Sequence, residues 1–306
     1  MGARWIDEIA GFVEVRENEP MSEHTSFGLG GPAEAMAFAR SRRDVVQIVD
    51  VCRRLDVDFR FLGNGTNILV SDDGVSGLVI NLKGLRGLVS GVSDGAALLF
   101  SECGVELATI VELAATEGFS GIEFASGIPA TVGGAVYTNA GTSVGDMSGV
   151  VHRILICDRS GRQIWTEYST FSPRYRNSGI PEGWAVLGAE FTLKRTSPGA
   201  VRDEVERYRR RRRERQPQGV PCAGSIFKNP PSRYAARLIE ELGLKGASVG
   251  GAKVSDVHAN FIVNEGASSA DVLALIRMVK DRVKSEFGIE LELEIELWGF
   301  AETDEP

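Results

Sequence analysis

The sequence predicts an α+β fold organised in two domains, and three observations support this prediction. Stretches with apolar residues at helical spacing occur together with short apolar runs that are typical of strands. The strands predicted in the middle of the chain follow one another without helices between them, which favours antiparallel pairing over regular βαβ repetition. The length of 306 residues is enough for two domains, or three small ones, with a substantial core.

The first third of the chain combines two helical patterns with three strands. Ser41 is a typical N-cap for a helix over residues 42–55, whose apolar side chains share one face. A second helix is predicted over residues 106–117 and ends at Gly118. Strands are predicted near residues 59–62, 78–82 and 97–103.

Strand patterns dominate the middle of the chain, and a domain boundary follows them. These strands are predicted near residues 150–158, 163–165 and 184–194. The turn-forming residues 196–199 then interrupt the pattern. We therefore expect a first domain over residues 1–197, made of two α+β subdomains, and a second over residues 198–301. Residues 302–306 are expected to fray.

The predicted second domain begins with an arginine-rich segment, residues 201–216, and a turn-rich joint. Two helices follow, and a glycine suited to the left-handed C-cap position closes each. The first spans residues 232–242 before Gly243, and the second runs from Ser269 or Ala270 to Phe287 before Gly288. In a last strand, residues 290–298, apolar residues alternate with glutamates, so one face is apolar and the other carries carboxylates.

Composition and charge argue against several classes of protein. A net charge of −8 is unfavourable for general nucleic-acid binding and for an anionic membrane surface. No apolar stretch approaches the ~20 residues of a membrane span, and the N-terminus lacks the basic-then-apolar order of a signal peptide. The four cysteines lack C-x-x-C spacing, so we expect neither a zinc or other metal site nor a disulfide framework. A reducing cytoplasm is the simplest location.

Two clusters of small residues carry the clearest functional signal. Residues 126–141 have almost no charge or bulk, so backbone N–H groups there can approach a ligand closely. A diphosphate suits such a cradle, because several N–H dipoles can neutralise it together. A glycine-rich turn packed under a sheet is the alternative. A second cluster, residues 63–67, follows an apolar strand and favours one extended ligand held from two sides. Neither cluster is a Rossmann or P-loop motif.

The segment of residues 220–230 concentrates small residues, a hydroxyl, an ammonium and an amide between prolines. One interpretation is a rigid shelf that presents Ser225 as a proton donor and Lys228 and Asn229 as anion and amide contacts. The other is a rigid connector whose polar groups satisfy the backbone. The segment alone does not select between them.

Two charged residues present a similar choice. Arg176 lies in an irregular stretch after Pro173, where an arginine is usually solvated. Glu294 shares a strand face with other carboxylates, and such a face usually points to water. Either residue gains a functional role only as part of a larger site.

Two further motifs suggest other classes of protein. Residues 91–95 match the G-x-S-x-G string of a hydrolase nucleophile elbow, which needs a strand before it and a helix after it. Because residues 97–100 form a second predicted strand, Ser93-Asp94-Gly95 is expected to be a hairpin turn. The seven arginines within residues 207–215 have no aromatic stacking platform, so a solvated helix face that can attract phosphates is expected there rather than a DNA-binding surface.

Six motifs in order along the chain resemble those of the UDP-N-acetylenolpyruvoylglucosamine reductase (MurB) family of peptidoglycan synthesis. Together they extend from residue 63 to residue 299, which makes the resemblance specific. The motifs are Gly-Asn-Gly-Thr-Asn (63–67), Gly-Ile-Pro-Ala-Thr-Val-Gly-Gly-Ala (127–135), Tyr-Arg-Asn-Ser (175–178), Ala-Gly-Ser-Ile-Phe-Lys-Asn-Pro (223–230), His-Ala-Asn-Phe-Ile-Val-Asn (258–264) and Leu-Glu-Leu-Glu-Ile-Glu-Leu-Trp-Gly (291–299).

The resemblance implies a two-part FAD-binding domain of the vanillyl-alcohol oxidase type over residues 1–197, followed by an α+β substrate-binding domain over residues 198–301. It implies non-covalent FAD, NADPH as co-substrate and a UDP-sugar substrate. No nucleic-acid, membrane or obligate protein partner is inferred. The residues that it and the two clusters assign to FAD are Gly63, Asn64, Gly65, Thr66, Asn67, Ser126, Gly127, Ile128, Pro129, Gly133, Gly134, Asn139, Ala140 and Gly141.

The activity implied is the NADPH-dependent reduction of UDP-N-acetylglucosamine enolpyruvate to UDP-N-acetylmuramate. A hydride from FAD reaches the enolpyruvyl β-carbon, and Ser225 protonates the α-carbon. Arg176 would lie against the substrate carboxylate with Glu294 beside it, where charge develops in the reaction. Lys228 and Asn229 would bind substrate. A flavin-dependent oxidase of the same fold, acting on another substrate, is the alternative.

The chain departs from the family pattern at a few positions. Asn64 stands where many relatives have glycine, and asparagine tolerates the left-handed conformations that such a loop uses. Cys222 lies three residues before Ser225, and some relatives use cysteine as the proton donor. Because Ser225 holds the motif position, we assign Cys222 to packing. The chain resembles the shorter form of the family, so contacts to the UDP diphosphate are not carried over.

Overall fold

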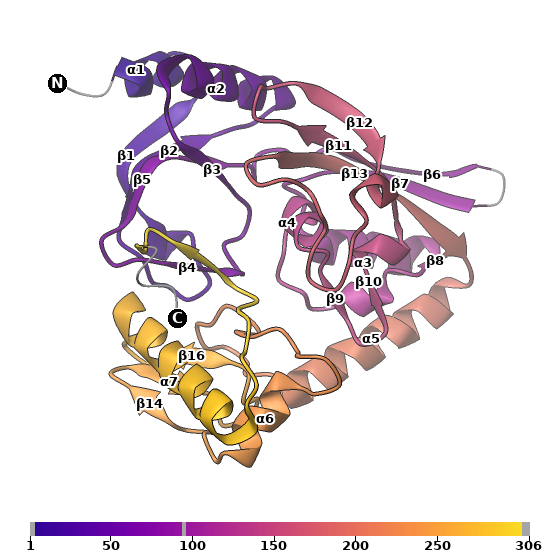
Figure 1. Ribbon diagram of the computed structural model, residues 1–306. Helices are drawn as coiled ribbons and strands as arrows, with labels where there is room; N and C mark the ends of the chain where they lie inside the picture. The colour runs from indigo at the N-terminus through magenta and orange to yellow at the C-terminus, as the bar shows by residue number, and fades with distance from the viewer. Residues whose placement is uncertain (1–3, 94–95, 302–306) are drawn as a thin grey trace. The chain divides into compact units, whose positions relative to one another are not determined.

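The computed structural model describes residues 4–93 and 96–301, which form two compact units (Figure 1). Both units combine helices and strands, which confirms the α+β class. The assignment of functional domains to residues 1–197 and 198–301 stays a prediction, and the tail 302–306 lies outside the described residues. Unit 1 consists of residues within Met1–Glu17, Ala35–Asn64 and Gly77–Arg212, and unit 2 of residues within Asn18–Glu34, Gly65–Ser76 and Arg213–Pro306.

A four-stranded sheet with the order β1-β2-β5-β3 belongs mainly to unit 1. The helix α2 (Arg42–Leu55) buries its apolar face in a cluster that includes sheet residues Leu78 and Ile80. Ser41 caps α2 as predicted, because its hydroxyl accepts from the Asp44 N–H and the Asp44 carboxylate accepts from the Ser41 N–H. The strands are β1 (Glu14–Pro20), β2 (Pro32–Phe38), β5 (Val75–Asn81) and β3 (Phe59–Leu62).

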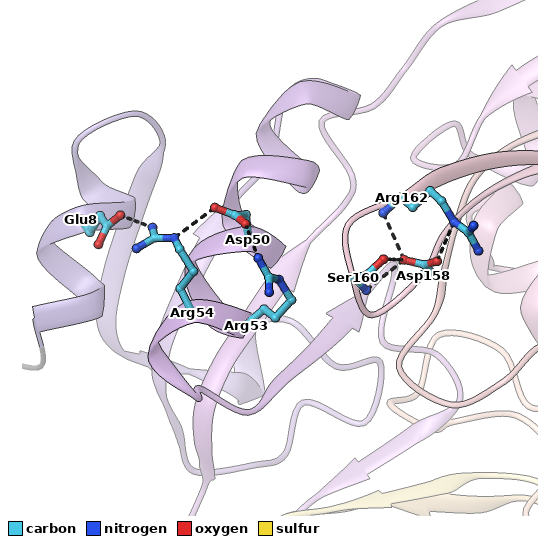
Figure 2. A network of polar contacts seen from close by, with 7 residues as sticks. All are labelled: Glu8, Asp50, Arg53, Arg54, Asp158, Ser160 and Arg162. Atoms are coloured by element: carbon cyan, nitrogen blue, oxygen red, sulfur yellow. Dashed lines mark hydrogen bonds and ion pairs between the residues drawn. The ribbon is translucent and has the colours of Figure 1, made fainter.

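Charged side chains connect elements at the surface of unit 1 (Figure 2). Arg54 of α2 pairs with Glu8 of α1 (Arg4–Ala10) and with Asp50 one turn earlier in its own helix. Elsewhere in the unit, the Asp158 carboxylate accepts from the Ser160 hydroxyl (2.6 Å) and from the Arg162 side chain (3.2 Å). Asp158 thereby closes a turn between two strands.

The second sheet of unit 1 is antiparallel, with the order β12-β11-β13-β7-β6 and a short strand β8 paired to β13. It packs against α3 (Leu107–Glu117) and α4 (Val132–Tyr137) through a large apolar core. The strands predicted in this region and the helix end at Gly118 are confirmed. The strands are β6 (Leu88–Ser93), β7 (Ala96–Glu102), β8 (Phe119–Ser120), β11 (Val151–Cys157), β12 (Gln163–Glu167) and β13 (Ala185–Arg195).

The hairpin formed by β6 and β7 decides the meaning of the G-x-S-x-G string. The two strands are antiparallel, with Ser93 opposite Ala96, so a strand and not a helix follows the string. A nucleophile elbow is therefore excluded. Asp94 and Gly95, where the sequence predicts the turn, lie outside the described residues.

Unit 2 is built around a three-stranded antiparallel sheet and two helices that share one apolar core. The long helix α7 (Ser269–Phe287) starts at Ser269 and ends at Gly288 as predicted, and Ser268 caps its start in a capping box with Asp271. A two-stranded parallel sheet joins the last strand to β4. The elements are β14 (Ser248–Val249), β15 (Ala252–Val254), β16 (Ile262–Asn264), α6 (Ala235–Glu241), β4 (Ile68–Val70) and β17 (Glu296–Trp298).

Two elements predicted in the second half differ from the structure. The helix predicted from residue 232 begins only at Ala235, because Ser232 has a left-handed backbone (φ 62°). The strand predicted over residues 290–298 is confined to β17. Leu291 and Ile295 are buried and the glutamates that follow them are exposed, but the alternation breaks at residues 293–294, where both side chains are half-buried. The extended backbone also changes its partner on the way. Glu294 bonds to Ile226, whereas Glu296 bonds to Asn67, so no single ladder forms.

Several smaller features complete the description. Helix α5 (Pro198–Arg215) carries the arginine run, and a short ribbon pairs β9 (Gly141–Thr142) with β10 (Gly145–Asp146). Among the described residues, no helix has the length and apolar character to cross a membrane, and no group of His, Cys, Asp or Glu is placed to hold a metal ion. The four cysteines are free thiols, and Cys222 packs against the core of unit 2 as expected.

Candidate active site

The two small-residue loops meet within unit 1. Gly63 comes directly after β3 and packs against Thr131. A Cβ atom at position 63 would lie 2.6 Å from the Thr131 hydroxyl oxygen. The Asn64 side-chain nitrogen donates to a Glu106 carboxylate oxygen (2.7 Å) and contacts the Pro129 carbonyl (3.4 Å). Only a residue without a side chain fits at position 63. The sequence pattern therefore located two loops that the fold places in direct contact.

Several polar groups beside this contact have no hydrogen-bond partner among the described residues. The side-chain oxygen of Asn64 is buried and has no hydrogen-bond partner among the described residues. The backbone N–H groups of Gly63, Asn64, Gly127 and Thr131 likewise donate to no described residue. A buried acceptor next to several donors suits a ligand that offers both kinds of group. A nucleotide cofactor with phosphate oxygens and ring N–H groups has this chemistry, so the residues present fit FAD.

The loop of residues 126–141 is partly helical, which the pattern of small residues did not predict. Helix α4 begins after Thr131, whose hydroxyl accepts from the Gly134 N–H (3.4 Å). At Gly133 a Cβ atom would lie 2.7 Å from the Cys103 Cβ, so glycine is needed there for packing under the sheet. The packed-turn interpretation therefore fits Gly133, whereas the ligand-cradle interpretation fits Gly127, whose N–H has no partner among the described residues. The other predicted cofactor residues in unit 1 are Ser126, Ile128, Pro129, Asn139, Ala140 and Gly141, which lie along this loop.

Arg176 lies in a tight turn of the same unit. Arg174 and Asn177 exchange both backbone hydrogen bonds (2.7 and 3.1 Å), which leaves Tyr175 and Arg176 at the tip. Arg176 has a left-handed backbone, with φ of 54°, a conformation that is unfavourable for an arginine. Its guanidinium lies 5.2 Å from the centre of the half-exposed Tyr175 ring. A strained residue at the tip of an anchored turn is typical of functional positions.

A second arginine lies beside the cradle and the Arg176 turn. The Cδ of Arg212 in α5 approaches Gly127 so closely that a Cβ there would lie 2.9 Å from it. Burial, together with the positive charge of Arg176, lowers the pKa of Arg212 to about 10. Among the described residues no carboxylate pairs with Arg212, whereas its neighbours Arg207 and Arg209 pair with Glu204 and Glu112. The arrangement of two repelling guanidiniums favours binding of an anion.

In unit 2 the fold brings Ser225 and Glu294 onto adjacent backbone segments. The Glu294 N–H donates to the Ile226 carbonyl and the Lys228 N–H to the Glu292 carbonyl, both at 2.8 Å. Ser225 is half-buried and directly precedes this ladder. These bonds fix the segment of residues 220–230 along one edge, as both the shelf and the connector interpretation require, so the choice between them stays open.

Two asparagines fix the pair of backbone segments formed by residues 226–228 and 292–294, a structural role that the sequence did not predict for them. Asn260 is buried and pairs with Phe227 through its side-chain amide. The Asn67 side-chain nitrogen donates to the Glu294 backbone carbonyl (3.0 Å), and the Asn67 backbone carbonyl accepts from the Glu296 N–H (2.9 Å). Asn67, predicted to bind the cofactor together with Gly65 and Thr66, therefore also fixes the backbone that carries Glu294.

The two residues predicted to contact substrate have protein partners in unit 2. Lys228 forms an ion pair with the exposed Glu292 (3.4 Å), a weak contact that solvent screens. The Asn229 side-chain oxygen accepts from the Ala235 N–H (3.0 Å) at the start of α6. Arg176 belongs to unit 1 and the Ser225–Glu294 pair to unit 2, so the convergence of all three on one substrate stays a prediction.

Comparisons with known proteins agree with these features. An FAD-binding domain model matches residues 33–167, and the model of the UDP-N-acetylenolpyruvoylglucosamine reductase C-terminal domain matches residues 216–298. The reductases of Moorella thermoacetica and Caldanaerobacter subterraneus are 43% and 41% identical, covering 94% and 92% of this chain and 94% and 93% of their own. The crystal structure of the Thermus caldophilus enzyme (MurB) has a TM-score of 0.77 at 35% identity, covering 94% of this chain and 98% of that one.

Proposed function

The chain belongs to the UDP-N-acetylenolpyruvoylglucosamine reductase (MurB) family of FAD-dependent oxidoreductases, and we propose that it uses NADPH to reduce UDP-N-acetylglucosamine enolpyruvate to UDP-N-acetylmuramate. This reaction supplies a precursor of peptidoglycan. The matches cover 94% of the Moorella thermoacetica reductase and 98% of the Thermus caldophilus chain.

One observation carries the proposal. Beside the contact between Asn64 and the loop of residues 126–141, a buried acceptor and several backbone donors have no partner within residues 4–93 and 96–301. These groups would hold non-covalent FAD, with the N–H groups of Gly63 and Gly127 available to its diphosphate. When bound, FAD would supply the hydride that the enolpyruvyl β-carbon accepts, after its own reduction by NADPH.

The reaction then needs charge stabilisation and a proton. Hydride addition to the β-carbon leaves negative charge on the α-carbon and its carboxylate. Arg176 would stabilise this charge with two parallel N–H donors, and Arg212 adds a second positive charge nearby. Glu294 would act beside the same carboxylate.

Ser225 would deliver a proton to the α-carbon, which completes the addition of one hydride and one proton across the double bond. A serine hydroxyl is a weak acid, so it requires a fixed position close to the carbon. The ladder that holds residues 226–228 against residues 292–294 supports this role, since it limits the movement of the serine. Lys228, the last residue of this ladder, and Asn229, the residue after it, would contact the UDP-sugar.

A single titration tests the proposal. The purified protein should be yellow, should bleach on addition of NADPH without oxygen, and should recover its colour when the enolpyruvyl substrate is added. Recovery with oxygen alone and not with the enolpyruvyl substrate would favour the alternative, an oxidase of the same fold. A colourless protein that does not take up FAD would refute both.

A further inference from the structure

Asn139 is buried just after α4, within the loop predicted to bind the cofactor. It is 1% exposed and has a left-handed backbone with φ of 46°. Both polar atoms of its side chain have protein partners. The nitrogen donates to the Arg174 carbonyl (2.8 Å), and the oxygen accepts from the Ser148 N–H (3.0 Å). An amide satisfied in this way is suited to holding protein segments together.

The Arg174 carbonyl is the group that closes the turn of Arg176. It accepts from the Asn177 N–H (3.1 Å) as well as from Asn139. Arg176 itself adopts an unfavourable backbone conformation at the tip of this turn. A strained residue keeps its conformation only when surrounding contacts impose it. The bond from Asn139 is such a contact, because it fixes the base of the turn.

We propose that Asn139 is a positioning residue for Arg176, fixing through the Arg174 carbonyl the turn that presents this guanidinium to the substrate carboxylate. The proposal rests on the proposed function, in which Arg176 acts on the substrate. It differs from the interpretation of Asn139 as a cofactor contact. Loss of the Asn139 amide should therefore affect transfer to the substrate and leave reduction of the flavin by NADPH intact.

Tyr168 offers a matched control, because it also makes a buried hydrogen bond to the region around α4. The Tyr168 hydroxyl is buried and donates to the Val136 carbonyl of α4 (2.8 Å). This bond joins the same helix to the segment that leads to the Arg176 turn, and its acceptor is the Val136 carbonyl and not a group of the turn. Tyr168→Phe removes one buried hydrogen bond, so it reports what a general loosening of this region does.

The test uses the FAD-loaded protein with the Asn139→Gly variant. Glycine accepts the left-handed backbone, so only the amide is lost. Flavin reduction by NADPH and flavin reoxidation by the enolpyruvyl substrate are measured separately without oxygen. We expect reoxidation to slow about tenfold or more, because a misplaced catalytic group is costly, while reduction changes less than about twofold. Tyr168→Phe should change both rates less than about twofold.

A double variant identifies the residue through which Asn139 acts. If the effect passes through Arg176, Asn139→Gly should slow reoxidation little further in an Arg176→Lys background. The proposal would be overturned if the rate losses of the two single variants multiplied in the double variant, or if Asn139→Gly left reoxidation unchanged. It would also be overturned if Asn139→Gly lowered FAD affinity as much as it slowed reoxidation. Normal reoxidation in Arg176→Lys alone would instead refute the role of Arg176 in the proposed function, so the two failures are distinguishable.

Asn139→Asp provides a second readout if the glycine variant does not fold. Aspartate can donate to the Arg174 carbonyl only when it is protonated. The reoxidation rate of this variant, relative to the unmodified protein at each pH, should rise several-fold as the pH falls from about 8 to about 5.5, since burial favours the neutral acid. A ratio that does not change with pH would contradict the positioning role.

Discussion

The side-chain amide of Asn260 pairs with both backbone groups of Phe227: its oxygen accepts from the Phe227 N–H (3.0 Å), and its nitrogen donates to the Phe227 carbonyl (2.8 Å). The Asn260 carbonyl also accepts from the Ile226 N–H (2.9 Å). A buried side chain thus replaces a neighbouring strand along the segment that follows Ser225.

Replacing Asn260 by alanine should destabilise the protein by about 2–4 kcal/mol, because it leaves two buried backbone groups of Phe227 without partners. Urea unfolding measures this change. Gln218→Ala is the control, since it removes an exposed amide that bonds only to neighbouring backbone carbonyls, and it should cost less than about 0.5 kcal/mol. A similar loss in both variants would show that the pairing with Phe227 has no special weight.

The backbone strain at Arg176 predicts a difference between two variants that both lose the guanidinium. Glycine adopts the observed φ of 54° without a steric penalty, whereas alanine does not. Arg176→Gly should therefore be more stable than Arg176→Ala by about 1 kcal/mol. Both variants should lose hydride transfer from the reduced flavin to the enolpyruvyl substrate. Denaturant unfolding compares the pair, and equal stabilities would show that the turn relaxes when the arginine is removed.

The elements that the sequence predicted well are those determined by neighbours in the chain. The predicted cap of α2 depends on Ser41 and on Asp44 three residues later, and Gly118 and Gly288 end their helices through their own left-handed backbones. The apolar spacing within each helix lies within the same short window. Such features require no knowledge of the tertiary fold.

The features that the sequence did not predict depend on partners far along the chain. The segment of residues 290–298 has a strand pattern, but the length of its strand is decided by Ile226 and Asn67, which come from other parts of the fold. Asn139 lies in the small-residue cluster of residues 126–141 and Asn260 in the motif of residues 258–264, yet neither pattern says whether an amide faces a ligand or a carbonyl. Arg212 is one of seven arginines in a run, and only the fold distinguishes it from its solvated neighbours.

The proton-donor role predicts a selective defect in Ser225→Ala. Flavin reduction by NADPH should survive, while turnover with the enolpyruvyl substrate should fall by about 10²-fold or more. Cys222→Ala serves as the control. Burial raises the pKa of the Cys222 thiol, which packs against the apolar core, so neither half-reaction should change by more than about twofold. Equal losses in both half-reactions of Ser225→Ala would refute the donor role.

The pH dependence of stability should include a contribution from His258. Burial, helped by the positive charge of Lys245 and opposed by Glu240, lowers the pKa of this imidazole below its ordinary value. Its Nδ1 accepts from the Asn260 N–H (3.3 Å), which also requires that nitrogen to be unprotonated. The unfolded chain therefore binds a proton more readily than the folded protein, and stability should fall as the pH decreases below about 6.5.

A variant isolates this contribution. The free energies of unfolding of the unmodified protein and of His258→Gln, measured in urea, should differ by a constant amount above about pH 6.5. Below that pH the unmodified protein should lose stability relative to the variant, since the variant lacks the titrating group. His152→Gln removes an exposed imidazole and serves as the control for loss of a histidine. A constant difference between the His258→Gln and unmodified proteins from pH 5 to 8 would remove His258 as a cause.

Arg212 should be destabilising in the protein without bound anions and favourable once an anion is present. Its lowered pKa, about 10, means that the folded protein disfavours the charged guanidinium, because of burial and the nearby Arg176. Replacing it by glutamine should therefore increase the free energy of unfolding by about 1–3 kcal/mol at neutral pH. The same change should weaken binding of the enolpyruvyl substrate about tenfold or more, since a charge-assisted contact is lost. Arg210→Gln, an exposed position on the same helix, should alter neither quantity, and a gain in stability without any loss of affinity would show that Arg212 does not face the anion.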